Sequence, residues 1–311
     1  MDNFADRLMR ACKEKNSIAV VGIDPRLDML PGTLLDSAVR KHGESLEAGA
    51  VALAEFSRRV IDAVAEYAVA VKPQSAFFEV LGPDGMTALR EVIGHAHQAG
   101  LLVIADVKRS DIGSTAEAYA SGFLGEVKVG QTKLRPWGAD AVSVSPYLGS
   151  DGLVPFIECA KEHGRGVFVL VKTSNPSSGE LQDLNADGVP IFERVGKWVA
   201  EHARELMGSS GYSSLGAVVG ATYPDQLARL REIMPKNIIL IPGYGAQGGT
   251  ASDVRCGLNA DGLGAIVNAS RSVIFAYRDK KWAAAHGETR WTEAVAAAAR
   301  KMRDELNEVR P

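Results

Sequence analysis

Short runs of consecutive apolar residues, many of them β-branched, recur along the chain, and segments with helical spacing of apolar positions lie between them. Eight such runs occur, at Ile18–Asp24, Ala68–Lys72, Leu101–Lys108, Ala139–Ser145, Gly166–Lys172, Ser214–Ala221, Asn237–Pro242 and Gly264–Ala269. The helical segments are Glu47–Glu66, Pro83–Ala99, Thr115–Leu124, Gly149–His163, Val189–Met207, Pro224–Met234, Ala251–Gly257 and Glu288–Val309. Nearly continuous apolar runs are typical of strands covered on both faces, and their alternation with helices predicts a parallel sheet.

The number of strand–helix units narrows the fold. Eight units within 311 residues favour an α/β fold with a closed (β/α)₈ TIM barrel. An open doubly wound sheet is the alternative, but it usually carries a glycine-rich fingerprint directly after its first strand. Here the first run ends in GIDPR, which contains no such loop. The barrel is therefore the preferred prediction.

The domain organisation follows from the same pattern. We expect one barrel domain over residues 1–311, because no repeat, low-complexity tract or linker interrupts the units. Three stretches are longer than a barrel needs, and we interpret them as surface insertions: Asp28–Ser45, Gly125–Pro136 and Ser174–Gly188. The last is rich in turn-forming residues, which favours a mobile surface loop.

The composition of the chain indicates which cellular compartment and which classes of binding partner to expect. The chain is 46% hydrophobic and 23% charged, as in ordinary soluble globular proteins. A net charge of -3 gives no electrostatic basis for binding nucleic acid or an anionic membrane. Cys12, Cys159 and Cys256 lie far apart without metal-type spacing, which favours a reduced, cytoplasmic protein. We also expect no signal peptide and no membrane span, since no apolar run reaches the roughly 18 residues that a span needs.

The most informative segment is Leu101–Gly113, which reads LLVIADVKRSDIG. A buried strand is predicted to end where its charges begin, so Asp106 and Lys108 share one face of it. Asp111 follows in the loop, within folding-back distance. A lysine between two carboxylates stays protonated at a fixed position, from which it can donate its proton.

Two earlier strands also end in charged residues, Asp24 in GIDP and Lys72 in VAVKPQ. The active site of a barrel lies at the carboxyl ends of its strands, and neighbouring strands are about 4.8 Å apart. Asp24, Lys72, Asp106 and Lys108 should therefore converge at one mouth. For any single residue a loop-end salt bridge explains the charge equally well. Four charges ending three successive strands point to function, because burying them is costly.

A second cluster follows the last two predicted strands, in Ile241–Thr250 (IPGYGAQGGT) and Asn268–Ser272 (NASRS). This is the usual phosphate site of a barrel, built from backbone N–H groups and a helix N-terminus. The glycines let the backbone approach an anion, Arg271 offers a guanidinium fork, and Gln247 could bridge the phosphate to another part of the ligand. Plain turns are the alternative, and Arg271 favours the phosphate site.

Strands four and five end in further polar residues. Ser145, in VSVSPYLG, could hydrogen-bond a polar ring edge or cap the following helix. Lys172 and Asn175 follow strand five in FVLVKTSNP. Lys172 could form a Schiff base, but we favour a solvent-facing or ligand-positioning role for it.

Taken together, these motifs resemble orotidine 5′-phosphate decarboxylase in its longer bacterial subtype, from Gly22 to Ser272. The DxKxxD element is the most specific part, although relatives in the same superfamily share it. PGxGAQGG, the late arginine, KPQSAFFE and SPYLG narrow the choice. The resemblance implies conversion of orotidine 5′-phosphate to uridine 5′-phosphate and CO₂ in de novo pyrimidine biosynthesis, without metal or cofactor.

The resemblance also implies roles for the charged residues. Lys72, Asp106, Lys108 and Asp111 match an alternating charge network, in which Lys108 protonates C6 of the pyrimidine. The equivalent of Asp111 enters the neighbouring subunit's site, with Thr115 beside it, so a homodimer is implied.

The remaining matches concern substrate binding. Asp24 matches a ligand of the ribose hydroxyls, Ser145 a contact of the pyrimidine edge, and Gln247 and Arg271 the phosphate contacts. We count Asn175 and Ser270 among the substrate-binding candidates as well. The short subtype commonly has glycine at the position of Ser270 and a different sequence after the pyrimidine serine.

Three other functions remain open on the sequence, one of them a Schiff-base aldolase that would use Lys172. A related sugar-phosphate decarboxylase or aldolase could use the same DxKxxD element, usually with Mg²⁺. A non-catalytic phosphoribosyl-ligand binding protein would keep Gln247 and Arg271 but has no need of the lysine–aspartate network. The network therefore favours the decarboxylase.

Overall fold

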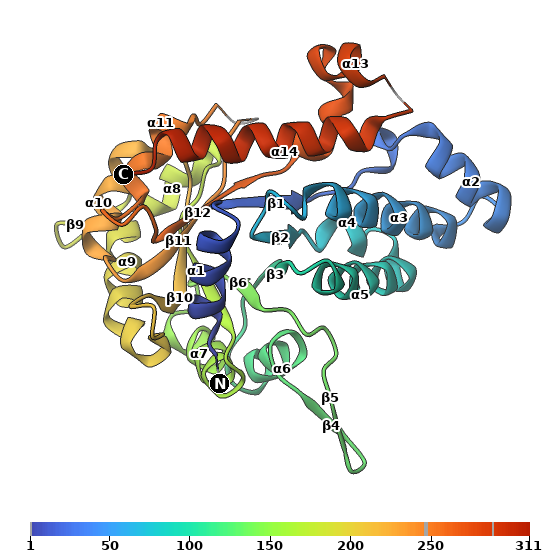
Figure 1. Ribbon diagram of the computed structural model, residues 1–311. Helices are drawn as coiled ribbons and strands as arrows, with labels where there is room; N and C mark the ends of the chain where they lie inside the picture. The colour runs from blue at the N-terminus through green and yellow to red at the C-terminus, as the bar shows by residue number, and fades with distance from the viewer. Residues whose placement is uncertain (1, 246–247, 288) are drawn as a thin grey trace.

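The computed structural model describes residues 2–245, 248–287 and 289–311. Its centre is a closed parallel barrel with the strand order β1-β12-β11-β10-β7-β6-β3-β2, which confirms the predicted (β/α)₈ fold (Figure 1). The barrel strands are β1 (Ala19–Ile23), β2 (Ala70–Pro73), β3 (Leu102–Arg109), β6 (Ala141–Val144), β7 (Gly166–Lys172), β10 (Ser213–Val219), β11 (Asn237–Ile241) and β12 (Ala265–Ala269). Each overlaps its predicted run, because apolar runs of this length are stable only with both faces covered.

Helices cover the outside of the barrel (Figure 1). Those that match predicted segments are α3 (Leu46–Val64), α5 (Gly82–Gln98), α6 (Gly113–Phe123), α7 (Val154–His163), α9 (Ile191–His202), α10 (Pro224–Ile233), α11 (Ala251–Val254) and α14 (Trp291–Glu308). Further helices are α1 (Phe4–Glu14), α2 (Gly32–His42), α4 (Ala76–Glu79), α8 (Gly179–Gln182), α12 (Arg271–Ile274) and α13 (Lys280–His286). Short 3₁₀ turns lie at Leu27–Met29, Ser150–Gly152, Pro176–Ser178, Ala203–Leu206, Arg255–Gly257 and Ala276–Arg278. Within the described residues no helix is both long and apolar enough to cross a membrane.

The N-terminal ends of the strands are closed by α1. Asn3 caps this helix by accepting a hydrogen bond from the backbone N–H of Asp6, and the ring of Phe4 packs edge-on against Phe168 of β7. Gly166, the first residue of β7, is required here, since a Cβ would lie 2.4 Å from the Phe4 ring. The closed base leaves the opposite end of the barrel for the site.

A buried carboxylate ties the base together. Asp140, which is 2% exposed, accepts hydrogen bonds from the guanidinium groups of Arg7 and Arg165, from the backbone N–H of Val103 and from the ring of His97. Burial alone would raise the pKa of Asp140, but the hydrogen bond to His97 and the charge of Arg7 lower it to about 2. This cluster joins α1, α5, β3 and the loop before β7.

Each predicted insertion contains regular structure. The first holds α2, and the second is a hairpin of β4 (Val127–Val129) and β5 (Thr132–Leu134), which projects from the body near α6 (Figure 1). The third holds α8 and β8 (Asn185–Ala186), which pairs with β9 (Val189–Pro190). The mobility of the third insertion stays a prediction.

Candidate active site

Two lysines and an aspartate meet at the carboxyl ends of β2 and β3. The Lys72 ammonium lies 2.6 Å from Oδ2 of Asp106, and the Lys108 ammonium lies 2.6 Å from Oδ1 of the same carboxylate. Asp106 is therefore the shared centre of a lysine–aspartate–lysine array. Lys72 and Asp106 are buried, whereas the Lys108 side chain is 46% exposed at the mouth.

The charges in the array stabilise one another. Burial alone would raise the pKa of Asp106, but the ammonium groups of Lys72 and Lys108 hold it well below its ordinary value. Burial alone would lower the pKa of Lys72, but the carboxylates of Asp106 and Asp24 raise it above its ordinary value. Asp106 thus stays ionised and Lys72 protonated near neutral pH, and two ammonium groups around one carboxylate give the three residues a formal positive charge.

Ser143 supports this array, and our sequence analysis missed it. Its Oγ donates a hydrogen bond of 2.8 Å to Oδ1 of Asp106 and accepts bonds of 3.1 Å and 3.0 Å from the backbone N–H groups of Val107 and Lys108. Lys108 has a φ of +43°, a left-handed conformation that is uncommon for a non-glycine residue. Its position in the sequence could have identified it, because Ser143 lies in β6 two residues before Ser145 and therefore on the same face of the strand.

Asp111 does not join the array of its own chain. Its Oδ1 accepts a hydrogen bond from the backbone N–H of Ile112, in the loop between β3 and α6. Lys108 pairs with Asp106, and no ion pair joins it to Asp111 among the described residues, so the lysine held between two carboxylates stays a prediction. Thr115 is exposed on the first turn of α6.

A cavity of about 330 Å³ opens beside the array. It is lined by Lys72, Asp106, Lys108, Leu170, Thr173, Ser174, Asn175, Val218, Leu240 and Pro242. Asn175 is part of this lining, and its Oδ1 accepts a hydrogen bond from the Thr173 hydroxyl at 2.7 Å. The lining combines the apolar side chains of Leu170, Val218 and Leu240 with the charged residues of the array.

Lys172 is buried rather than solvent-facing, and the ligand-positioning interpretation stays a prediction. It is fully buried, its ammonium lies 2.7 Å from Oδ1 of Asp183, and it also lies 4.5 Å from the centre of the Tyr223 ring. The solvent-facing interpretation is therefore wrong. Because Asp183 belongs to the third insertion, the ion pair fastens that insertion to the end of β7.

Three of the described glycines after β11 have a left-handed backbone conformation. Gly243, Gly245 and Gly248 have φ values of 95°, 74° and 94°, which only glycine adopts without strain. The Gly245 N–H donates to the carbonyl of Gly249 at 2.8 Å. Gln247 lies outside the described residues.

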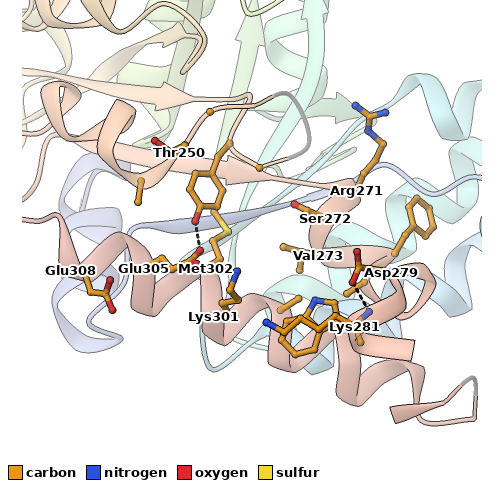
Figure 2. A pocket seen from close by; sticks show the side chains of 18 of the residues that line it. Thr250, Arg271, Ser272, Val273, Asp279, Lys281, Lys301, Met302, Glu305 and Glu308 are labelled. Atoms are coloured by element: carbon orange, nitrogen blue, oxygen red, sulfur yellow. Dashed lines mark hydrogen bonds and ion pairs between the residues drawn. The ribbon is translucent and has the colours of Figure 1, made fainter. Parts of the chain in front are cut away.

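Arg271 begins α12, directly after β12, and its side chain is exposed. It borders a second cavity, of about 680 Å³, between the glycine-rich turn and α14. Figure 2 shows Arg271 on one edge of this cavity and Lys301 and Glu305 of α14 on another. The hydroxyl of Tyr244 donates a 2.6 Å hydrogen bond to Glu305, which ties the turn to α14.

Three more candidates border the mouth. Asp24 follows β1 and is half-buried, and Ser270 follows β12. Oδ1 of Asp24 and Oγ of Ser270 are both buried without a hydrogen-bond partner among the described residues. Ser145 follows β6, where its Oγ accepts a long bond of 3.4 Å from the N–H of Tyr147. Among the described residues no group of three or more histidine, cysteine or acidic side chains is placed to hold a metal ion.

A closed (β/α)₈ barrel with a lysine–aspartate–lysine array at the carboxyl ends of its strands, where barrel enzymes have their active sites, is a barrel enzyme. The chain belongs to the orotidine 5′-phosphate decarboxylase / HUMPS family, whose sequence pattern matches residues 50–286.

Similar proteins agree along nearly the whole chain. An orotidine 5′-phosphate decarboxylase of Rhodopirellula baltica is 50% identical over 306 residues, which are 98% of this chain and 99% of the relative. One of Deinococcus radiodurans is 41% identical over 307 residues, 98% of this chain and 97% of the relative. Among solved structures, OMP decarboxylase of Leishmania donovani is 33% identical with a TM-score of 0.74, covering 99% of this chain and 98% of that one. A crystal structure described as a putative orotidine 5′-phosphate decarboxylase of Streptomyces avermitilis is 35% identical with a TM-score of 0.77, covering 99% and 96%.

Proposed function

We propose that this chain is a carboxy-lyase that converts orotidine 5′-phosphate to uridine 5′-phosphate and CO₂ in de novo pyrimidine biosynthesis, without metal or cofactor. The relatives of that name support the reaction, at up to 50% identity over nearly the full chain. The observation that carries the assignment is the array of Lys72, Asp106 and Lys108 beside the cavity.

The chemistry needs a fixed positive charge. When the bond between C6 and the carboxylate breaks, the electron pair stays on C6, where no neighbouring group delocalises it. An ammonium about 4 Å away stabilises such a charge by about 4 kcal/mol at an effective dielectric constant near 20. Lys108 supplies that charge, its Nζ proton forms the new C6–H bond, and solvent then reprotonates the amine.

The surroundings of Asp106 decide between two roles for it. One role is to repel the substrate carboxylate, a form of ground-state stress whose contribution is contested. Here Oδ2 of Asp106 pairs with the Lys72 ammonium, and Oδ1 pairs with the Lys108 ammonium and accepts a hydrogen bond from the Ser143 hydroxyl. We therefore assign Asp106 chiefly to holding the Lys108 ammonium in place, as a positioning residue.

Substrate binding is assigned by position around the mouth. Arg271 and Gln247 bind the phosphate, Asp24 binds ribose hydroxyls, and Ser145 contacts the pyrimidine edge. Asn175 and Ser270 complete the set, since Asn175 lines the cavity and Ser270 lies between β12 and Arg271. Phosphate binding is remote from the bond that breaks, but its energy can order the charged array for the reaction.

A homodimer completes the site in this proposal, with Asp111 and Thr115 crossing to the partner subunit. The supporting observation is that Asp111 lies in the loop after β3, where its carboxylate accepts a hydrogen bond from the N–H of Ile112 and forms no ion pair with Lys108 among the described residues. Ile112, beside Asp111, exposes 52% of its surface, so this loop presents an apolar residue as well as a carboxylate.

The β4–β5 hairpin offers further surface for the same contact. Val127, Val129 and Leu134 expose 37%, 61% and 49% of their surfaces and share one face of the hairpin. The other face carries Lys128 and Lys133, which line a groove against the acidic residues of α6 and α7. The apolar face therefore turns away from its own barrel, and two-stranded hairpins are marginally stable alone. We assign it to the interface with the second copy, since it directly follows α6.

A two-arm assay tests the reaction. Loss of orotidine 5′-phosphate absorbance is followed for wild type, Lys108→Ala and the control Lys41→Ala, each with and without excess chelator. We expect wild type and Lys41→Ala to keep their rate in chelator, and Lys108→Ala to lose at least about 10²–10⁴-fold in kcat. Near-normal kcat for Lys108→Ala would refute its role as proton donor. Loss of wild-type activity in chelator would favour a metal-dependent sugar-phosphate enzyme of the same superfamily.

A mixing experiment tests the shared site. Lys108→Ala and Asp111→Ala chains should each be inactive alone, but a mixed dimer contains one site with both native residues. A 1:1 mixture that exchanges subunits should recover about a quarter of wild-type activity, as random pairing in a two-fold dimer predicts. Activity that stays at the level of the separate variants, although sedimentation shows exchange, would contradict the crossing of Asp111.

We propose a reducing, cytoplasmic location for the protein. The three cysteines are free, Cys12 is buried, and burial raises the pKa of its thiol to about 12 and that of Cys159 to about 11. Thiols of this kind are poorly reactive and need no oxidising compartment. Labelling with a thiol reagent under native conditions should leave Cys12 unmodified.

A further inference from the structure

Asn268 is a buried polar residue in β12 that none of the assigned roles uses. It is 7% exposed, and its amide oxygen is buried without a hydrogen-bond partner among the described residues. Native proteins rarely leave such an oxygen unpaired, and an unpaired one beside an active site is a candidate for contact with a ligand.

The strand register places this amide on the inner face of the barrel. Asn268 pairs with Val20 of β1, and Gly22, two residues further on, pairs with Lys72 of β2. Paired residues of parallel strands, and residues two apart on one strand, face the same side. Asn268 therefore shares the inner face with Lys72, which lines the active-site cavity, as does Pro242 after the strand on the other side of β12.

Gly22 gives the amide its room. A Cβ at Gly22 would lie 3.2 Å from Oδ1 and 3.3 Å from Nδ2 of Asn268, and 2.9 Å from Cβ of Ser270. The amide thus lies over the bare backbone of β1, between β12 and the strand that carries Lys72.

The unpaired oxygens of this corner share a chemical character. Oδ1 of Asn268, Oδ1 of Asp24 and Oγ of Ser270 are all buried without a partner among the described residues. An amide oxygen and a carboxylate oxygen can only accept hydrogen bonds, and the hydroxyl of Ser270 can accept as well. A ligand for this corner must therefore bring hydrogen-bond donors. Orotidine 5′-phosphate has its adjacent donors in the two ribose hydroxyls.

We propose that Asn268 is a further substrate-contacting residue, whose amide oxygen accepts a hydrogen bond from one ribose hydroxyl beside the hydroxyl bound by Asp24. Asn268 thereby contributes to selection of ribose over deoxyribose. This inference rests on the proposed reaction for the identity of the nucleotide.

The test compares orotidine 5′-phosphate with its 2′-deoxy and 3′-deoxy analogues, for wild type, Asn268→Ala and Asn268→Leu. In wild type, loss of the contacted hydroxyl should lower kcat/KM by about 3–10-fold, as expected for one neutral hydrogen bond. With orotidine 5′-phosphate, kcat/KM of both variants should fall by a similar factor. With the analogue that lacks the contacted hydroxyl, kcat/KM of both variants should equal that of wild type. The other analogue should stay equally impaired in wild type and variants, because Asp24 is intact.

Stability separates this role from a structural one. Asn268→Leu replaces the unpaired buried amide by an apolar side chain with the same number of heavy atoms, so its melting temperature should equal or exceed that of Asn268→Ala. The matched control is Asn237→Ala at the base of β11, whose amide donates to the carbonyls of Val199 and Leu215. This control should melt lower and leave the ratios between the three substrates unchanged.

Two results would overturn the inference. One is an equal loss of kcat/KM for all three substrates in both Asn268 variants. The other is a lower melting temperature of both variants with unchanged kcat/KM. Failure of wild type to turn over orotidine 5′-phosphate would instead refute the proposed reaction, so the two failures are distinguishable.

Discussion

Ser143→Ala is the sharpest test of how the charged array is held. The substitution removes the hydroxyl that donates to Asp106 and accepts from the backbone N–H groups of Val107 and Lys108. A hydrogen bond to a charged group is worth about 1.5–3 kcal/mol. The two N–H groups also lose their acceptor, at the residue whose φ of +43° must be maintained.

These losses translate into two measurements. If the substitution removes about 2–3 kcal/mol of stabilisation from the transition state alone, kcat falls about 30–150-fold and KM stays within about twofold of wild type. Unfolding entropy scales with chain length, so for 311 residues about 3 kcal/mol lowers the melting temperature by about 4–5 °C. Steady-state kinetics with orotidine 5′-phosphate and calorimetry measure both quantities.

The matched control is Ser57→Ala. Ser57 is equally buried, but its hydroxyl donates to the Leu53 carbonyl within α3, far from the array. We expect this variant to keep wild-type kcat and to melt within about 2 °C of wild type, because it loses one neutral hydrogen bond. The reasoning about Ser143 is refuted if Ser143→Ala keeps kcat within twofold of Ser57→Ala.

Three further predictions concern residues around the barrel. Gly22→Ala places a Cβ 2.9 Å from Ser270, so we expect loss of substrate affinity at the mouth, measured as a rise in KM of at least about tenfold. The lowered pKa of Asp140 stabilises the fold above the unfolded value of 3.8 and is lost as pH falls toward about 2. Denaturant unfolding should show about 2 kcal/mol of this pH dependence in wild type and none of it in Asp140→Asn. Asp183→Asn leaves Lys172 buried without its carboxylate partner, so limited proteolysis should cut the 174–188 insertion faster than in Lys172→Met, in which no buried charge remains.

The sequence allows the barrel to be predicted because its signals are local. Each strand is an apolar run bounded by polar residues, and β7 (Gly166–Lys172) ends where the apolar run meets Lys172. Eight strand–helix units are the number that closes into a parallel barrel, so the number of runs was enough to predict the topology. The same signals were present for α1, with buried residues at Phe4, Leu8 and Cys12, but its place across the base depends on distant partners such as Phe168.

The site was less predictable, because the contacts that hold it join residues far apart in the sequence. That Lys72, Asp106 and Lys108 converge follows from the end positions of neighbouring strands. The role of Ser143 does not, since a serine within a buried strand usually satisfies its hydroxyl in the backbone. Lys172 shows the limit most clearly: its burial depends on Asp183, eleven residues later, and on the Tyr223 ring after β10.

The geometry of Asp106 also bears on how the array meets its substrate. Each of its oxygens faces an ammonium, so the array presents net positive charge to the cavity rather than a lone carboxylate. An anionic substrate should therefore be attracted to this end of the barrel, and the attraction should weaken with ionic strength because Lys108 is partly exposed. If ground-state repulsion by Asp106 dominated instead, added salt would screen it and tighten binding. The two accounts predict opposite signs for the salt dependence of binding. It is measured as KM in wild type, and as the dissociation constant of uridine 5′-phosphate in wild type and in Lys108→Ala.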